Sequence, residues 1–441
     1  MIGDDELNRL LIIGNGFDLA CNLESSYDSF FNYRFHQLFG EKGFNHVYDK
    51  ITSVLESESS IFQERPFPIR NSVIQELKSD LLGDPNLWDI FFILAKKNLS
   101  NGGGSKWSDV ESTIFGIISI VLVNDRANTL FSFKSKISES NFIKYIKWLS
   151  YYSDGTKEKV AQFLLNELKK FEEVFATYIS SLVANNIYKD NAKTLLKELC
   201  RVSDPQDPDK TENLNVISFN YSLNELFGIQ FSSEVERVNS NFRLDSWSNV
   251  HGVANFNDGR TKSQINIKHH IAQSHELPRP IFGIDGYDRN NNKMIQDDRL
   301  IFTKSYRVID NKISSIRNFD NFLLDLPNID VITIMGHSLD AADYSYFETI
   351  FDRCNLSSDE SSVKIEFYYY EGNDIKNESK NIFRQKALQK VIRLLNSYGE
   401  SLNVEHGYNL VSKLNFEGRF AFRPNPRLSM REINYESYGA N

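Results

Sequence analysis

The feature that most constrains the fold is a series of short, largely apolar runs that end in turn residues. The first run covers residues 10–13 and is followed directly by the sequence GNGFD. Comparable runs occur at residues 214–219, 281–284, 331–335 and 363–370. Near-continuous apolar runs are typical of strands that are covered on both faces, as in parallel sheets with helices on either side. The sequence therefore predicts an α/β fold with a doubly wound, mostly parallel sheet.

Much of the remaining chain has helical spacing. From Val160 to Leu182, apolar side chains recur at steps of three and four, which predicts one long amphipathic helix. Ser25 or Ser26 can cap an earlier helix. At 441 residues the chain exceeds the usual size of one hydrophobic core. We predict an α/β core at residues 1–45 and 206–372, a large inserted helical domain at residues 46–205, and a C-terminal helix and tail at residues 373–441.

Charge and cysteine content exclude several classes of protein. The chain carries 50 Lys and Arg against 59 Asp and Glu, a net charge of −9. This balance argues against general nucleic-acid binding through phosphate neutralisation, although a local basic patch is compatible with it. Three cysteines are too few for a disulfide framework or a four-cysteine zinc site.

The beginning of the chain is acidic and lacks the basic flank of a signal peptide. The longest apolar run, at residues 114–123, is too short to span a bilayer. We therefore expect a cytoplasmic protein that does not contact a membrane.

The turn after the first apolar run is a candidate binding site. Gly14 and Gly16 would let backbone amides approach a diphosphate at the edge of the sheet where ligands of open α/β folds bind. Asp18 follows them and can bind a ribose or cap the helix. The third glycine of the dinucleotide fingerprint is missing, so the glycines can equally serve only the turn.

Two polar residues follow later apolar segments. Asn220 ends the run at 216–219, and its amide could fix a water or a sugar hydroxyl without adding charge. His251 precedes Gly252 and can take a proton near neutral pH, while the glycine leaves room for a substrate. The alternatives are a turn-forming asparagine and a structural histidine.

The sequence GHSLD at residues 336–340 allows two interpretations. A strand, Gly-x-Ser and a helix is the setting of a hydrolase nucleophile elbow, with Ser338 as the nucleophile. Asp340 stands where the strained elbow needs a small residue, which argues against a serine hydrolase. In a nucleotide-binding fold, Gly336, Ser338 and Asp343 would instead line the adenine-ribose side, or only cap the next helix.

Several charged residues are weaker candidates. Trp107, Asp109 and Glu111 begin a predicted helix, where acids are favourable without any catalytic role. Glu111 is retained as a catalytic candidate because its helix could close over the glycine turn. Asp285 and Lys304 are at predicted strand or loop ends, where solvated surface positions are common.

Two polar clusters suggest no site. The histidines within residues 269–275 lack a carboxylate partner that would complete a helical metal motif, so a polar loop is expected and no metal is predicted. Arginines recur every four residues from Arg419 to Arg431. Pro424 and Pro426 prevent a helix from aligning them.

Six motifs, in this order, carry a family resemblance. They resemble the signature blocks of the AbiH family of bacteriophage abortive-infection proteins and together reach from residue 10 to about residue 370. The blocks are GNGFD at 14–18, WSDVE at 107–111, SFNY at 218–221, VHG at 250–252, IFGID at 281–285 and MGHSL at 335–339.

The AbiH pattern resembles, more distantly, sirtuin-like domains, which bind NAD with a glycine turn, a strand-end asparagine and a His-Gly pair. This likeness implies that Asn220 lies near the attacking water and the nicotinamide-side ribose, and that His251 lies beside a ribose hydroxyl. It also implies a set of cofactor contacts near the phosphates and riboses. These contacts are Gly14, Asn15, Gly16, Phe17, Asp18, Ser222, Gly336, Ser338 and Asp343.

Two departures limit what the resemblance implies. Sirtuins usually carry an acid where this chain has Ser222, and deacylating sirtuins hold zinc with four cysteines, more than the chain contains. Antiphage relatives with sirtuin-like domains commonly destroy NAD instead. We therefore expect an abortive-infection effector that binds NAD or a related nucleotide and hydrolyses its N-glycosidic bond, with Asn220 and His251 as catalytic residues.

Two other functions are compatible with the same residues. The first is a non-catalytic nucleotide sensor or assembly protein of a phage defence system, and the second is a serine hydrolase that uses Ser338. A homo-oligomer and a phage-derived trigger are also compatible with the sequence.

Overall fold

The structure is a computed structural model of the whole chain. It describes residues 6–57, 69–99, 107–123, 156–200, 211–237, 241–255, 266–267, 270–271, 279–288, 293–310, 328–340, 343–372, 377–402 and 409–433. Within these ranges, no helix is both long and apolar enough to cross a membrane.

The chain divides into two compact units. Unit 1 comprises residues 1–25, 176–280 and 312–441, and unit 2 comprises residues 26–175 and 281–311. Helix α8 (Lys157–Val183) contributes to both, because the division falls between Phe175 and Ala176.

Unit 1 contains a six-stranded parallel sheet with the order β10-β9-β8-β1-β2-β3. From the centre, the chain first builds outward from β1 to β3 and then, on the other side, from β8 to β10. The sheet is therefore doubly wound, and its topological switch point lies between β1 and β8. The strands are β1 (Glu6–Ile13), β2 (Thr211–Ser218), β3 (Phe242–Asn249), β8 (Val331–Met335), β9 (Lys364–Tyr369) and β10 (Phe420–Pro424).

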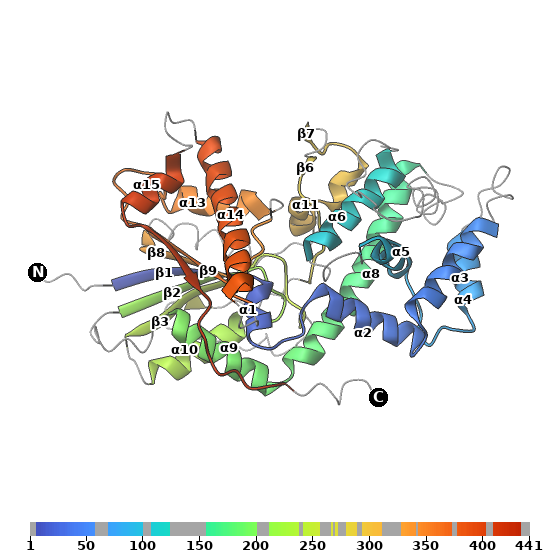
Figure 1. Cartoon of the computed structure of the whole chain (residues 1–441), viewed down its shortest axis with the longest axis horizontal. Coiled ribbons are helices and arrows are strands. Elements are labelled where there is room, and N and C mark those ends of the chain that lie inside the picture. The colour runs from blue at the N-terminus through green and yellow to red at the C-terminus, as the bar shows by residue number, and fades with distance from the viewer. Residues whose placement is uncertain are drawn as a thin grey trace, which may run out of the picture. The chain divides into compact units, whose positions relative to one another are not determined.

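Helices cover both faces of this sheet (Figure 1). On one face, Leu10 and Ile12 pack in a buried cluster with residues of α13, α14 and α15. On the other face, toward α9, Arg9 bonds Glu212 and Thr333, as expected from the alternation of side chains along a strand. The helices of unit 1 are α1 (Asn15–Ala20), α9 (Asn186–Leu199), α10 (Glu225–Glu236), α13 (Tyr344–Arg353), α14 (Asn377–Ser401) and α15 (Leu410–Phe416). Two short strands, β4 (Asn266–Ile267) and β5 (His270–Ile271), pair separately.

Unit 2 is mainly helical and is built around aromatic side chains. The ring of Phe30 lies 5.4 Å from that of Phe171, which in turn lies 5.0 Å from Phe92. These contacts join α2, α5 and α8. The elements of unit 2 besides α8 are α2 (Tyr27–Phe39), α3 (Phe44–Ser57), α4 (Ile69–Leu77), α5 (Leu87–Leu99), α6 (Trp107–Ile118), the π-helix η2 (Ser119–Val123), β6 (Tyr287–Asp288), β7 (Lys293–Met294), the 3-10 helix η4 (Asp298–Phe302) and α11 (Lys304–Asp310).

Several predictions about individual elements can be compared with the structure. The α/β class, the parallel sheet and the long helix from Val160 to Leu182 are confirmed. Of the two serines offered as helix caps, Ser26 accepts from the backbone of Ser29. The predicted strand at 281–284 is wrong, because only Ile284 forms an isolated bridge, to Thr303. The short apolar run is buried in unit 2 instead of pairing in the sheet.

Candidate functional site

The loops that follow β1 and β8 meet at the carboxyl edge of the sheet in unit 1. Gly16 donates its amide to the carbonyl of Gly336 at 2.8 Å, and Gly14 donates to Met335 at 3.0 Å. A Cβ atom on Gly16 would lie 2.7 Å from the Cα of Gly336. Gly336 itself has a φ of +72°, and a Cβ there would lie 2.2 Å from the amide nitrogen of Phe17. Glycine is thus needed here for the close approach of two backbones.

This packing bears directly on the predicted phosphate contacts. The amides of Gly14, Gly16 and Phe17 each donate to a protein carbonyl, with Phe17 bonded to Gly14 at 2.8 Å. They are therefore already engaged in the described structure. Contact of these residues with a cofactor stays a prediction, and it would require other atoms or a rearrangement of the two loops.

Asp18 is the centre of a buried hydrogen-bond network. This residue is only 2% exposed. The hydroxyl of Tyr188 lies 2.7 Å from Asp18 Oδ1 and 2.9 Å from Ser222 Oγ. Burial raises the pKa of Asp18 to about 6, although hydrogen bonds from Ser222, Tyr188 and Asn220 oppose the shift. A carboxyl with this pKa changes its proton occupancy close to neutral pH.

Asn220 joins the end of β2 to the glycine turn. Its side-chain nitrogen donates to the carbonyl of Gly14 at 2.9 Å and also bonds the Asp18 carboxyl. The bond to Gly14 fixes the orientation of the amide group. Its Oδ1 is buried and has no hydrogen-bond partner within the described ranges. An oriented, unsatisfied acceptor is therefore present at the carboxyl edge of the sheet.

His251 and His337 flank one carboxylate. The Nε2 atom of His251 lies 3.7 Å from Asp343 Oδ1, and the Nε2 atom of His337 lies 3.4 Å from Asp343 Oδ2. The ring of Phe219 packs edge-on against both imidazoles, with centroid distances of 5.2 Å and 4.4 Å. Asp343, which sequence analysis places near a ligand, can therefore orient two histidines and compensate a positive charge on either ring.

The tautomer of His337 follows from its backbone contact. The amide of Leu339 donates to His337 Nδ1 at 2.9 Å, so the neutral ring carries its proton on Nε2, which faces Asp343. Leu339 has a φ of +52°, an uncommon conformation for a residue with a side chain. This strain falls on Leu339 and not on Ser338, unlike in a nucleophile elbow, where the serine occupies the strained position.

Ser338 is exposed, and its carbonyl accepts from Lys390 at 2.8 Å. No hydrogen bond from its hydroxyl to a histidine is present in the described part of the chain. The serine hydrolase alternative therefore gains no catalytic pair from this geometry.

Glu111 lies in unit 2, on α6, and forms an ion pair with Lys304 at 2.8 Å. Lys304 is buried, whereas sequence analysis predicts a solvated surface position, so that expectation is wrong. A Cβ on Gly283 would lie 2.9 Å from the Lys304 side chain, which explains the glycine in the IFGID motif. The side chains of Trp107 and Asp109 lie outside the described part of the chain.

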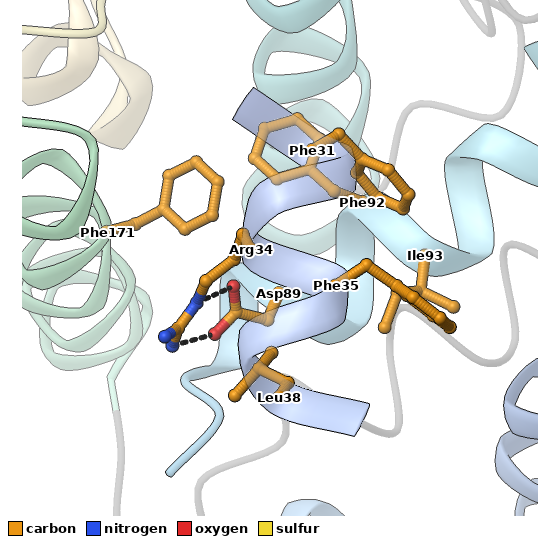
Figure 2. A pocket seen from close by; sticks show the side chains of 8 residues that line it. All are labelled: Phe31, Arg34, Phe35, Leu38, Asp89, Phe92, Ile93 and Phe171. Carbon is orange, nitrogen blue, oxygen red and sulfur yellow. Dashed lines mark hydrogen bonds and ion pairs between the residues drawn. The ribbon is translucent and has the colours of Figure 1, made fainter. Parts of the chain in front are cut away.

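A narrow apolar pocket in unit 2 contains a second buried ion pair (Figure 2). The guanidinium of Arg34 approaches Asp89 with two contacts, at 3.0 Å and 2.7 Å. Burial raises the pKa of Asp89 despite this partner. The surrounding side chains are mostly aromatic, among them Phe31, Phe92 and Phe171. Because the ion pair is satisfied internally, it fixes α2 against α5 and leaves no group aimed at a ligand.

Among the described side chains, no group of three or more His, Cys, Asp or Glu could hold a metal ion. The imidazoles of His269, His270 and His275 lie outside the described side chains. Of the spaced arginines, Arg419 is buried and bonds main-chain carbonyls, while Arg427 and Arg431 form ion pairs with Glu371 and Asp190.

Two residues of the site are absent from the sequence-based candidates. Tyr188 lies within an amphipathic helix and has no motif around it, so only the fold reveals that it reaches Asp18. His337 is part of the GHSLD sequence, in which the motif indicates Ser338 as the candidate residue. Its position two residues after an apolar strand, beside Gly336, is the same signal that points to Asn220.

The site therefore defines a doubly wound α/β protein with a polar cluster at its topological switch point. Residues 10–369 of the chain match the family model described as bacteriophage abortive infection AbiH. Because the match covers most of the chain and includes all six motifs, the protein belongs to the AbiH family, and the assignment made from those motifs is confirmed. Membership of this family indicates a role in phage abortive infection. No curated protein shows significant similarity to the chain.

Proposed function

We propose that this protein is an abortive-infection effector that binds NAD or a related nucleotide at the switch point and hydrolyses its N-glycosidic bond. The proposal includes a sirtuin-like character of the α/β core, a cytoplasmic location and a phage-derived trigger. Unit 1 supports the ligand class, because its strand order is the one found in dinucleotide-binding sheets. In such sheets ligands bind beyond the carboxyl ends of the strands at the switch point.

The observation that carries the proposal is the buried Oδ1 atom of Asn220. Leaving a buried acceptor unsatisfied costs roughly 1–3 kcal/mol, so such a group is usually retained for a purpose. The rest of the amide is held by Gly14 and Asp18, which aims this oxygen independently of any ligand. It suits a ribose hydroxyl or a water that needs an acceptor without charge.

The proposed reaction requires little covalent chemistry. Water forms a bond to the ribose C1′ atom, the C–N bond breaks, and nicotinamide leaves with the bonding electron pair. The water proton passes to a base, for which His251 beside Asp343 is suited. Asn220 would orient the water or the ribose, and Asp343 would stabilise the imidazolium.

The sensor alternative is favoured by one specific observation. Because the Gly14, Gly16 and Phe17 amides already donate to carbonyls, nucleotide binding would have to alter the contact between the two glycine loops. A binding event of this kind could change conformation without turnover.

The test measures nicotinamide release from NAD by chromatography, together with calorimetry of NAD and ADP-ribose binding. We expect Asn220→Ala to reduce release at least tenfold while the circular dichroism spectrum is retained. Asn215→Ala is the matched control, because Asn215 is another buried asparagine, within β2, and among the described side chains it bonds only Ser246. Full release by Asn220→Ala would refute the catalytic role. Binding without product would support the sensor. If the protein neither binds NAD nor releases nicotinamide, NAD is rejected as the ligand.

A further inference from the structure

An exposed aromatic and cationic surface lies in unit 1 where β9 and β10 end. The ring of Tyr369 stacks on that of Phe422, with centroids 4.4 Å apart and planes inclined by 15°. Next to them in sequence, Tyr370 packs edge-on against Phe383 of α14 at 5.8 Å. Tyr370 is 52% exposed and Phe383 is 42% exposed. We call these four rings and the adjacent Arg384 the ring patch.

Cations accompany these rings. The guanidinium of Arg384 lies over the face of Phe422, 5.9 Å from its centroid, and forms no ion pair in the described part of the chain. Arg427 forms an ion pair with Glu371 at 2.5 Å. Arg427 and, to a smaller extent, Lys380 lower the pKa of the Glu371 carboxyl. The charge of Glu371 is thus compensated, while Arg384 remains available to an anion.

The ring of Phe383 packs closely against the backbone of Gly372. Gly372 follows β9 with a φ of +86°, and a Cβ atom there would lie 2.8 Å from the Phe383 ring. The position of the Phe383 ring therefore requires a glycine at residue 372. Around it, residues 381–386 of α14 are exposed on every side, including Ile382 and Phe383. Ile382 and Phe383 therefore place apolar surface in contact with solvent on this segment.

We propose that the ring patch binds single-stranded nucleic acid. Aromatic faces stack on bases without regard to sequence, and neighbouring cations neutralise phosphates. An overall charge of −9 disfavours binding over the general surface, so that an anionic strand would be directed to this local region. Arginine adds a second planar surface for stacking, which a bare anion or a duplex backbone would not use. The proposal does not depend on nucleotide hydrolysis at the switch point.

The test is fluorescence anisotropy of the full chain with labelled 12-nucleotide thymidine DNA and uridine RNA, with a duplex of equal length as competitor. We expect binding that favours single strands. If about three cations contact phosphates, affinity should fall roughly eighteenfold between 50 and 200 mM salt. Phe383→Ala should weaken binding about tenfold through lost stacking, and Arg384→Gln should weaken it and reduce the salt dependence.

Matched controls separate the patch from general effects. Phe416→Ala removes another exposed aromatic ring of unit 1, which is 94% exposed at the end of α15, and Lys197→Gln removes an exposed cation on α9. Both should leave affinity unchanged. No binding by the unmodified protein, preference for duplex, or equal loss in the control variants would overturn the proposal. Self-association abolished by Phe383→Ala with unchanged oligonucleotide binding would overturn it in favour of a protein partner.

Discussion

The side-chain amide of Asn220 donates to the main-chain carbonyl of Gly14 at 2.9 Å, across a sequence separation of 206 residues. This bond ties the end of β2 to the turn after β1, and the same amide also interacts with the Asp18 carboxyl. The glycine turn and the asparagine of two separate motifs are therefore parts of one cluster. Its members depend on each other, so changes in one should alter the properties of the others.

Tyr188→Phe should destabilise unit 1 by roughly 1–3 kcal/mol, because it leaves Asp18 and Ser222 with fewer partners in a buried place. Urea unfolding measures the change. Tyr178→Phe is the control, since its hydroxyl donates to the carbonyl of Glu24 in a partly buried setting. A loss no larger than that of the control would show that the Tyr188 hydroxyl does not support the Asp18 network.

The pKa of Asp18 predicts a particular pH dependence of stability. The pKa is raised from 3.8 to about 6 in the folded state, so the native state binds the proton more tightly than the unfolded chain. This contribution to stability is complete below the unfolded pKa and is lost as pH rises through about 6. Relative to Asp18→Asn, the unmodified protein should lose on the order of 2 kcal/mol between pH 4 and pH 7. A stability difference that stays constant over this range would contradict the shift.

The sheet could be predicted in outline because each of its four central strands contains an apolar run. β1, β2, β8 and β9 each contain an apolar run and end in turn residues. β3 and β10 could not be found in this way. β3 carries polar residues such as Arg243 and Asp245 at the edge of the sheet, and β10 contains Pro424, which an edge strand tolerates.

The site was predictable only where a motif follows a strand. Asn220 directly follows β2, while Asp343 comes just before α13 in the GHSLD region after β8, and the structure brings both to the same edge as the glycine turn. Tyr188 could not be found, because its role depends on how α9 packs. The function of Gly14 and Gly16 also depends on tertiary structure. In sequence, the two glycines would suit either a bound phosphate or a closely packed neighbouring backbone. Only the position of Gly336 in the fold shows that they pack against a backbone.

Gly16→Ala should be strongly destabilising. The added Cβ atom would lie 2.7 Å from the Cα of Gly336, and neither backbone can move without breaking the bonds between the two loops. We expect a loss of about 1–3 kcal/mol or more, as for overpacked cores. Gly43→Ala is the control, since apart from its chain neighbours no atom of the described residues lies within 4 Å of its Cβ position. Thermal unfolding compares the two, and equal midpoints would show that the loops separate easily.

The C-terminal segment is held by the side chain of Asn191, which bonds both the main-chain amide and the carbonyl of Arg431. Asn191 accepts from the amide of Arg431 at 2.9 Å and donates to its carbonyl at 2.8 Å, and it also bonds the carbonyl of Cys21. Asn191→Ala removes all three bonds at a buried position, which should lower the free energy of local opening by roughly 1–3 kcal/mol.

Limited trypsin digestion detects this opening, because cleavage at Arg427 and Arg431 tracks the population of the released segment when closing is fast. Cleavage should be about tenfold faster in Asn191→Ala. Asp190→Ala is the matched control on the neighbouring residue, since among the described residues its side chain forms only the exposed ion pair with Arg431, which contributes little. Equal cleavage rates in both variants would mean that the segment is held by contacts other than the Asn191 amide.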